Sequence, residues 1–235
     1  MARSIPPERF AQLIEAATRT FVARGYRQTQ MADVAAQLGV AKGTLYGYVE
    51  SKEALFDAAV RFADGQTPAP LTSTLPLRTP PAGTTVAYVR ERLTQEAREL
   101  RVVSALAAPA SSVPAADELE QIVRDLYRRM TRHRNALKLV DRCALDHPEL
   151  GAVWFAEGRW GQVALLTAYF ERSIAAGRMR AVPSVPLAAR MTLETVALWA
   201  VHMPWDASPR AYDAAEVEAS VVDLLVHALA VEMRA

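Results

Sequence analysis

Residues 31–56, MADVAAQLGVAKGTLYGYVESKEALF, limit the possible fold more than any other stretch of the sequence. Four apolar side chains recur there at a spacing that can close a small core between two short helices. These side chains are Val34, Leu38, Val40 and Leu45. Gly39 stands between the two helices, where the turn needs a residue that tolerates a positive φ. The pattern therefore predicts a helix, a sharp turn and a second helix over about residues 31–50.

The second predicted helix offers side chains that suit contact with DNA. Lysine ammonium and hydroxyl groups reach phosphate oxygens, and side chains at the start of such a helix enter the major groove. The alternative is a solvated helical face with Tyr46 in the core, but the turn spacing favours DNA binding. We predict that eight residues contact double-stranded DNA: Thr29, Gln30, Lys42, Gly43, Thr44, Tyr46, Tyr48 and Lys52.

This N-terminal stretch resembles the tetracycline-repressor (TetR) family of bacterial regulators over residues 1–62. The matching residues are Gly25, Tyr26, Thr29, Val34, Ala35, Leu38, Gly39, Val40, Lys42, Gly43, Thr44, Leu45, Tyr46, Tyr48, Ser51, Lys52, Glu53, Ala54 and Leu55. Gln30, Gly47 and Val49 depart from the family pattern, so we expect no base contact from position 47. Farther along, only 147–150 and 176–178 look like parts of some family members.

The resemblance implies a homodimeric transcriptional regulator that binds a palindromic operator. Repression, relieved by a small molecule bound in the C-terminal part, is the usual mode in the family. Activation remains open on the sequence alone. Two other classes also remain open: an all-α enzyme or ligand carrier with an incidental helix-turn-helix, and a DNA-binding protein without an effector.

A Pro-rich interruption sets the expected domain organisation. Residues 64–83, DGQTPAPLTSTLPLRTPPAG, contain five Pro and break the helical pattern. We expect a DNA-binding domain over 7–67, a partly mobile linker over 68–83, and a ligand-sensing and dimerisation domain over 84–235.

The composition favours helix throughout the chain. Glycine is sparse, Ala, Leu, Arg and Glu abound, and no convincing alternating run predicts a sheet. The predicted fold is all-α, with an N-terminal helix-turn-helix three-helix domain and a larger C-terminal helical bundle. In the C-terminal part we expect helices over Val86–Leu106, Leu119–Leu145 with a bend, Val153–Ala176, Leu187–Met203 and Ala214–Met233.

Two sets of C-terminal residues are candidates for binding. Aromatic and apolar side chains between helices can line a pocket for a small apolar or aromatic effector, although plain core packing is the alternative. The candidate ligand-binding residues are Leu100, Tyr127, Met130, Trp154 and Trp160. The last two predicted helices carry apolar stripes wide enough for a two-fold interface. The candidate dimerisation residues are Leu187, Met191, Val217, Val221, Leu224, Leu225 and Ala228.

Charge and cysteine content restrict the remaining possibilities. The net charge is only +1, so DNA binding has to come from a local surface. Cys143 is the only cysteine, which suits a reducing cytoplasm. We expect no signal peptide in MARSIPPERF and no membrane span in 187–205, because charged residues interrupt the latter.

No motif predicts catalysis or a bound cofactor. The sequence shows no Gly-rich phosphate loop, no HExxH and no Gly-x-Ser-x-Gly. Cys143 and His147 are four residues apart and can share a helix face, but two ligands do not make a metal site. We therefore predict a non-enzymatic protein without a metal or cofactor.

Overall fold

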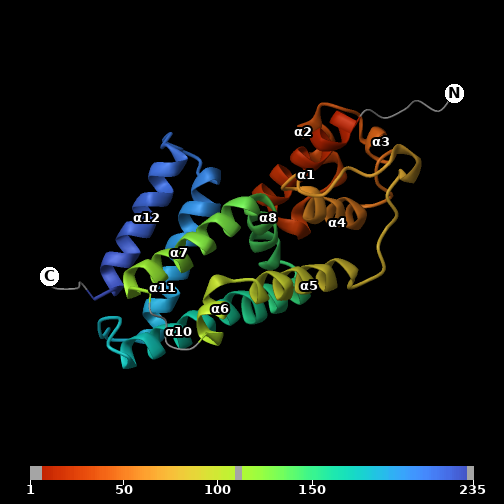
Figure 1. The fold of residues 1–235 in the computed structure, drawn as a ribbon. Coiled ribbons are helices and arrows are strands. Elements are labelled where there is room, and N and C mark those ends of the chain that lie inside the picture. The colour runs from red at the N-terminus through yellow and green to blue at the C-terminus, as the bar shows by residue number, and fades with distance from the viewer. Residues whose placement is uncertain (1–6, 109–112, 232–235) are drawn as a thin grey trace. The chain divides into compact units, whose positions relative to one another are not determined.

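The computed structural model describes residues 7–108 and 113–231, and the regular elements in those two ranges are all helices. Strand-type pairing within them is limited to two isolated bridges, Val49 with Leu77 and Met179 with Ala230. The prediction of an all-α fold is confirmed (Figure 1).

Four helices open the described chain. They are α1 (Pro7–Gln28), α2 (Met31–Leu38), α3 (Lys42–Leu45) and α4 (Lys52–Phe62). Apolar residues at helical spacing on α1, among them Leu13, Ala17 and Phe21, are buried, and α1 packs against α2 and α4. Gly25 interrupts α1 with a φ of 82°, which only glycine adopts without strain, so the helix axis is broken at this residue.

The second helix of the motif is shorter than predicted. The sequence predicts that the motif extends to about residue 50, but regular helix ends at Leu45 and residues 46–48 continue as turns. Gly47 N–H donates to Thr44 O at 3.2 Å, and Tyr48 N–H donates to Leu45 O at 2.9 Å. Gly43, Thr44 and Gly47 have low helix propensity, which explains why one helical turn gives way to looser turns.

The remaining elements follow in chain order. They are η1 (Thr72–Thr74), α5 (Thr84–Arg98), α6 (Arg101–Ala107), α7 (Ala115–Arg132), α8 (Arg134–Ala144), α9 (Pro148–Gly151), the π-helix η2 (Ala152–Arg159), α10 (Trp160–Ala175), α11 (Val185–Ala197), the π-helix η3 (Leu198–His202), the 3-10 helix η4 (Met203–Trp205) and α12 (Ala214–Leu229). The helix expected over Val86–Leu106 is therefore two helices, because Leu100 takes an extended conformation. The bend expected before Leu145 lies at His133.

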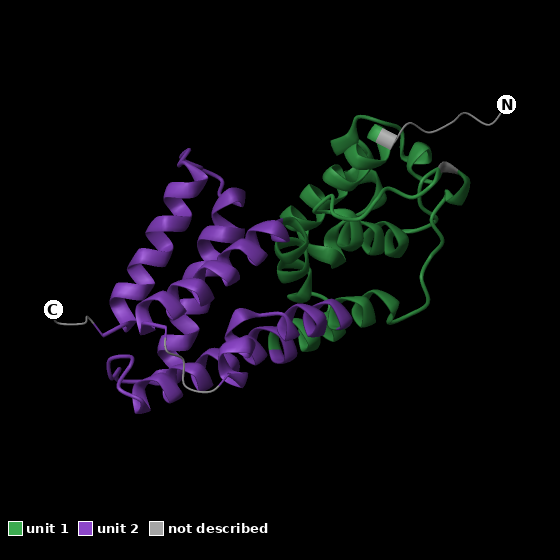
Figure 2. Cartoon of the chain, viewed as in Figure 1, with its two compact units in different colours: residues 1–90, 135–155 green, residues 91–134, 156–235 purple. Residues whose placement is uncertain are grey.

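The chain forms two compact units that are not continuous in sequence (Figure 2). Unit 1 comprises 1–90 and 135–155, and unit 2 comprises 91–134 and 156–235. Residues 135–155 thus group with the N-terminal helices, although we expected them within a domain over 84–235. The functional domain boundaries stay a prediction.

The core of unit 2 is arranged around α7. This helix packs against α6, α11, η3 and α12, while α10 packs against α6 and α11. Leu119, Ile122 and Val123 of α7 are fully buried, and their helical spacing places them on one face of the helix.

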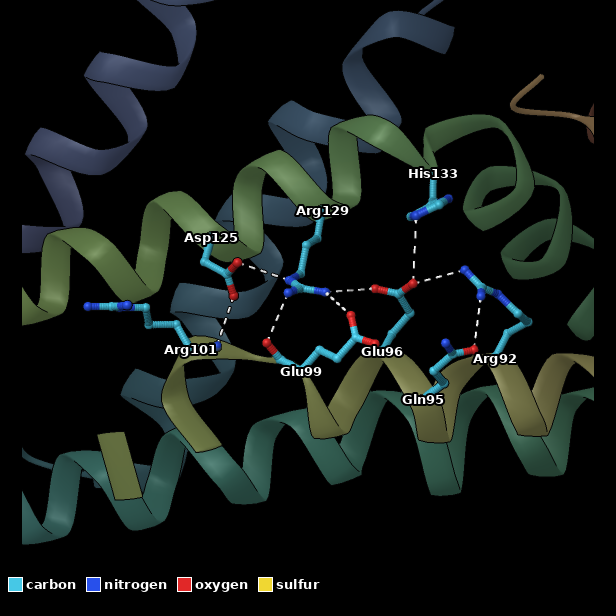
Figure 3. Close-up of polar contacts among 8 residues, drawn as sticks. All are labelled: Arg92, Gln95, Glu96, Glu99, Arg101, Asp125, Arg129 and His133. Carbon is cyan, nitrogen blue, oxygen red and sulfur yellow. Dashed lines mark hydrogen bonds and ion pairs between the residues drawn. The ribbon is translucent and has the colours of Figure 1, made fainter. Parts of the chain in front are cut away.

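A polar network adds to the packing of α7 in unit 2 (Figure 3). The Arg129 guanidinium lies 3.1 Å from Glu96 Oε2 and 2.9 Å from Asp125 Oδ1. Its Nη2 also donates to Glu99 O at 2.9 Å. Because Glu96 and Glu99 flank the end of α5, this one side chain fixes that end of α5 against α7.

Candidate nucleic-acid interface

The turn between α2 and α3 has the geometry that the sequence predicts. Gly39 takes the left-handed conformation with φ at 71°. Its N–H donates to Ala36 O at 3.1 Å, and Val40 N–H donates to Ala35 O at 3.0 Å. These bonds satisfy carbonyl groups at the end of α2 and turn the chain sharply. Val34 and Leu45 are fully buried, so the two helices share the expected small core.

The start of α2 differs from expectation at Thr29. The Thr29 side chain is only 1% exposed, and its hydroxyl donates to Gly25 O at 2.7 Å. Gln30, which is exposed, is the N-cap residue of α2, and its N–H donates to Asp33 Oδ2 at 2.9 Å. A role of the Thr29 side chain in DNA contact therefore stays a prediction that its burial disfavours.

An exposed face follows the turn. Lys42, Gly43 and Thr44 are exposed, and the Tyr46 side chain is 42% exposed. Tyr48 is buried at 7%, so it is Tyr48 that packs inward, whereas Tyr46 faces solvent. The alternative of a core Tyr46 is therefore excluded. The geometry brings an ammonium, a hydroxyl and a phenol together on one short element after a sharp turn.

The ammonium group of Lys52 is already hydrogen-bonded to the backbone of α1. Its Nζ donates to Tyr26 O at 2.9 Å and to Arg27 O at 3.3 Å, and it lies 4.6 Å from the centre of the Tyr26 ring. Those carbonyls belong to the last turn of α1, so the cation caps a helix end. Contact between Lys52 and DNA stays a prediction, and it would compete with this cap.

A cluster that the sequence did not predict holds the same end of α1. The Asp146 carboxylate accepts the N–H of Tyr26 at 3.0 Å through Oδ1 and the N–H of Arg27 at 3.1 Å through Oδ2. A Cβ at Gly25 would lie 2.4 Å from Asp146 Oδ2 and 2.6 Å from Arg142 Nη1. A larger residue at position 25 would therefore displace the ends of the Asp146 and Arg142 side chains, and the positive φ at this position already favours glycine. The only available sequence signal was Gly25 itself, since the partner is 120 residues away.

Two groups in this cluster have raised pKa values. Burial, helped by the nearby Glu53 carboxylate, raises the pKa of the Tyr26 phenol to about 12. Burial also raises the pKa of the Cys143 thiol to about 12, with the Asp146 charge acting in the same direction. Both groups are therefore neutral at physiological pH. The Tyr26 ring also lies against Phe56 and His147, at centroid distances of 4.9 Å and 5.1 Å.

The candidate ligand-binding residues do not all lie in one unit. Leu100 and Tyr127 are buried and Met130 is half-buried in unit 2. Trp160, also in unit 2, is 56% exposed with Arg190 over its ring at 4.9 Å. Trp154 belongs to unit 1, where its Nε1 donates to Asp141 Oδ1 at 2.8 Å. Their role as ligand contacts stays a prediction, for which Leu100, Tyr127 and Met130 are best placed.

The candidate dimerisation residues divide into exposed and buried groups. Leu187, Met191 and Leu224 are exposed. Val217 and Ala228 are half-buried, and Val221 and Leu225 are buried. Because α12 packs against α7, the last two residues already lie inside unit 2.

Over 7–108 and 113–231, no group of three or more His, Cys, Asp or Glu side chains is arranged to hold a metal ion. Within the same ranges, no helix has the length and apolar character needed to cross a membrane.

Comparisons with known proteins agree with this geometry. Residues 13–59 match the family model of bacterial regulatory proteins, tetR family. A curated relative, the fatty acid metabolism regulator protein of Bacillus subtilis (strain 168), is 36% identical over 58 residues. That match covers 25% of this chain and spans only 30% of the relative's length.

Solved structures resemble the whole chain in fold. The ketosteroid transcriptional regulator KstR2 of Mycobacterium tuberculosis has a TM-score of 0.60 at 17% identity, covering 99% of this chain and 100% of that one. A tetR-family regulatory protein from Rhodococcus RHA1 has a TM-score of 0.52 at 18% identity, covering 94% and 97%. The prediction that the chain is not an enzyme agrees with these regulatory proteins. Residues 13–59 of this chain are thus similar to the tetR family of bacterial regulatory proteins, and the chain has the same fold as these two solved regulators.

Proposed function

We propose that the chain is a homodimeric transcriptional repressor that binds a palindromic operator and is released by a small lipophilic effector. One observation carries the proposal: the exposed Lys42, Gly43, Thr44 and Tyr46 directly follow the left-handed turn at Gly39. Side chains at the start of the second helix of such a motif are the ones that enter the major groove. Binding to DNA would place the protein in the cytoplasm.

The exposed residues suit both parts of DNA recognition. The Lys42 ammonium and the Thr44 hydroxyl can bind phosphate oxygens, which position a protein on the duplex. The backbone at Gly43 has open space around its Cα, so a phosphate or base edge can approach closely. Tyr46 offers an apolar ring for contact with a thymine methyl group and a hydroxyl for a base edge or phosphate. We infer that these four residues and Gln30 form the DNA surface.

The dimer interface is best assigned to α10 and α11. These helices pack against each other and expose Trp160, Leu187 and Met191. Leu198 of η3, which follows α11 directly, is also exposed. An exposed apolar patch shared by neighbouring helices is a typical contact surface, and a two-fold axis through it would match a palindromic operator. We propose this surface in preference to the predicted pairing of α11 with α12, because Val221 and Leu225 of α12 are already buried within unit 2.

The effector is proposed to bind in unit 2, near Leu100, Tyr127 and Met130. These side chains are apolar or aromatic and lie on or beside α6 and α7, which contact each other. Burial of apolar ligand area contributes about 25 cal/mol per Å², so a lipophilic molecule fits such surroundings. The curated relative is a fatty acid metabolism regulator, which is consistent with a lipophilic effector here.

A DNA selection tests the proposal. The full-length protein is used to enrich duplexes from a random library, and bound duplexes are sequenced. We expect a palindrome with half-sites about one helical turn apart, bound by two chains. Enrichment of no sequence, together with the same weak affinity for every duplex, would refute operator recognition.

A ligand screen on the same protein then tests the switch. A library of lipophilic compounds is screened by thermal shift, and the hits are titrated against the operator complex. To release DNA, an effector has to bind the non-binding conformation more tightly than the DNA-binding one. Stabilising hits that leave operator affinity unchanged would favour a DNA-binding protein without a switch.

A further inference from the structure

The Pro-rich segment 64–83 pairs with the end of the helix-turn-helix. Leu77 N–H donates to Tyr48 O at 2.8 Å, and Glu50 N–H donates to Leu77 O at 3.0 Å. Val49 and Leu77 thereby form a parallel bridge within unit 1. Figure 1 shows the segment between α4 and α5, and its paired residue Leu77 lies beside the chain that follows α3. The segment is therefore bound to the motif at residues 48–50.

A second attachment follows directly. Thr79 N–H donates to Glu50 Oε2 at 2.9 Å, and Thr79 Oγ1 donates to Ser51 Oγ at 2.8 Å. Ser51 is the N-cap of α4, where its Oγ accepts Ala54 N–H at 3.1 Å. Residues 77–79, here named the brace, thus join the end of the turns after α3 to the start of α4.

The turns after α3 need such support. Regular helix in α3 is only four residues long, and a single helical turn is not stable by itself. A helix end also leaves carbonyl groups without partners, and Leu77 supplies the missing donor for Tyr48 O. The brace therefore fixes the backbone at residues 48–51, which directly follows Tyr46 and Gly47.

The middle residue of the brace is an exposed cation. Arg78 makes no hydrogen bond or ion pair among residues 7–108 and 113–231, although both of its chain neighbours are bonded to the motif. Glu50 is the acidic residue of the paired segment 48–51, and one of its carboxylate oxygens accepts the Thr79 N–H. An unpaired guanidinium held beside 48–51 has the chemistry to bind a phosphate bidentately.

We propose that the brace is part of the DNA-binding surface: it positions the turns that carry Tyr46, and Arg78 binds a phosphate of the DNA backbone. This inference rests on the proposed function, because it assumes that α3 contacts DNA. It adds a contact from a segment after the helix-turn-helix that the sequence marks only as a linker.

Arg78→Ala tests the phosphate contact. Arg98→Ala is the matched control, because Arg98 is an exposed arginine of α5 in unit 2 without an ion pair among the described residues. Affinity for the selected operator and for random duplex is measured by fluorescence anisotropy over a range of salt concentrations. We expect Arg78→Ala to weaken binding to both duplexes and to reduce the salt slope by about one, with no change for Arg98→Ala. The same slope in both variants would overturn the contact.

Thr79→Val tests the positioning role. Thr74→Val is the control, because the Thr74 hydroxyl donates only to Leu71 O within the same segment. We expect Thr79→Val to weaken operator binding roughly three- to tenfold and to speed hydrogen exchange at the Leu77 and Glu50 amides. Equal operator affinity in the two variants would overturn the positioning role. A wild-type protein that binds no duplex would instead refute the proposed function, so the two failures are distinguishable.

Discussion

At the scale of single residues, the surroundings of two lysines decide what each can do. The Lys42 ammonium is exposed, whereas the Lys52 ammonium caps the last carbonyls of α1. We expect Lys42→Ala to lower the salt slope of DNA binding by about one and to change the free energy of unfolding by less than about 0.5 kcal/mol. Lys52→Ala should instead destabilise unit 1 by about 1 kcal/mol, since Tyr26 O and Arg27 O lose their donor.

Thermal unfolding and salt-dependent anisotropy of both lysine variants check this expectation. The two measurements separate a DNA contact from a structural cap. If Lys52→Ala kept full stability and lost the same salt slope as Lys42→Ala, its assignment as a cap would be wrong.

The Cys143 thiol gives a second expectation at this scale. Because its pKa is raised to about 12 from an ordinary value of 9.0, the folded protein keeps it as a neutral, buried thiol. The buried neutral thiol makes its full contribution to the free energy of unfolding below pH 9. This contribution is lost as the pH rises toward 12, because the thiol then ionises in the folded protein as well. We expect iodoacetamide at pH 8 to leave Cys143 unmodified in folded protein and to label it in urea, as mass spectrometry would show. Rapid labelling without urea would contradict this.

At the scale of elements, Asp146 connects residues distant in sequence. Its carboxylate accepts the Tyr26 and Arg27 amides just after the break at Gly25. We expect Asp146→Ala to destabilise unit 1 by about 1–3 kcal/mol, because two backbone donors lose a charged acceptor. Hydrogen exchange at those two amides measures the effect.

Asp223→Ala is the control for Asp146. Asp223 is an exposed carboxylate of α12, 3.1 Å from the His227 ring. Its removal should leave the exchange of the Tyr26 and Arg27 amides unchanged. Equal exchange rates in the two variants would show that Asp146 does not hold this end of α1.

Local patterns in the sequence predicted most of the elements but not all of their ends. Apolar spacing and Gly39 identified the turn between α2 and α3, because both depend on nearby residues. The positions of the helix breaks at Leu100 and His133 could not be predicted from the sequence, because apolar residues continue at helical spacing on both sides of each break. Lys52 and Thr29 are predicted to contact DNA from their residue type and position, and no local pattern reveals that both also donate to backbone carbonyls within the protein. The bonds of Thr79 and Asp146 join residues 28 and 120 positions apart, which a single sequence cannot show.

At the scale of the whole molecule, the proposed dimer predicts different effects for substitutions at two exposed apolar residues. Met191 of α11 and Leu224 of α12 are 61% and 63% exposed. We expect Met191→Glu to convert the dimer to a monomer at micromolar concentration and to weaken operator binding, because a charge would enter the interface of α10 and α11. Leu224→Glu should stay dimeric. Sedimentation velocity measures the oligomeric state of both variants. A monomeric Leu224→Glu variant beside a dimeric Met191→Glu variant would show that the interface lies on α12.

Unit 1 combines the first 90 residues with a separate segment, residues 135–155. Because residues 135–155 belong to it, a fragment that ends near residue 90 lacks Asp146 and His147. Such a fragment exposes one face of Tyr26 and leaves the end of α1 without its carboxylate acceptor. The helix-turn-helix region therefore cannot be transferred to another protein as the first 90 residues alone. A chimera that transplants this DNA specificity onto another sensor has to carry a discontinuous graft, with residues 135–155 travelling alongside the first 90.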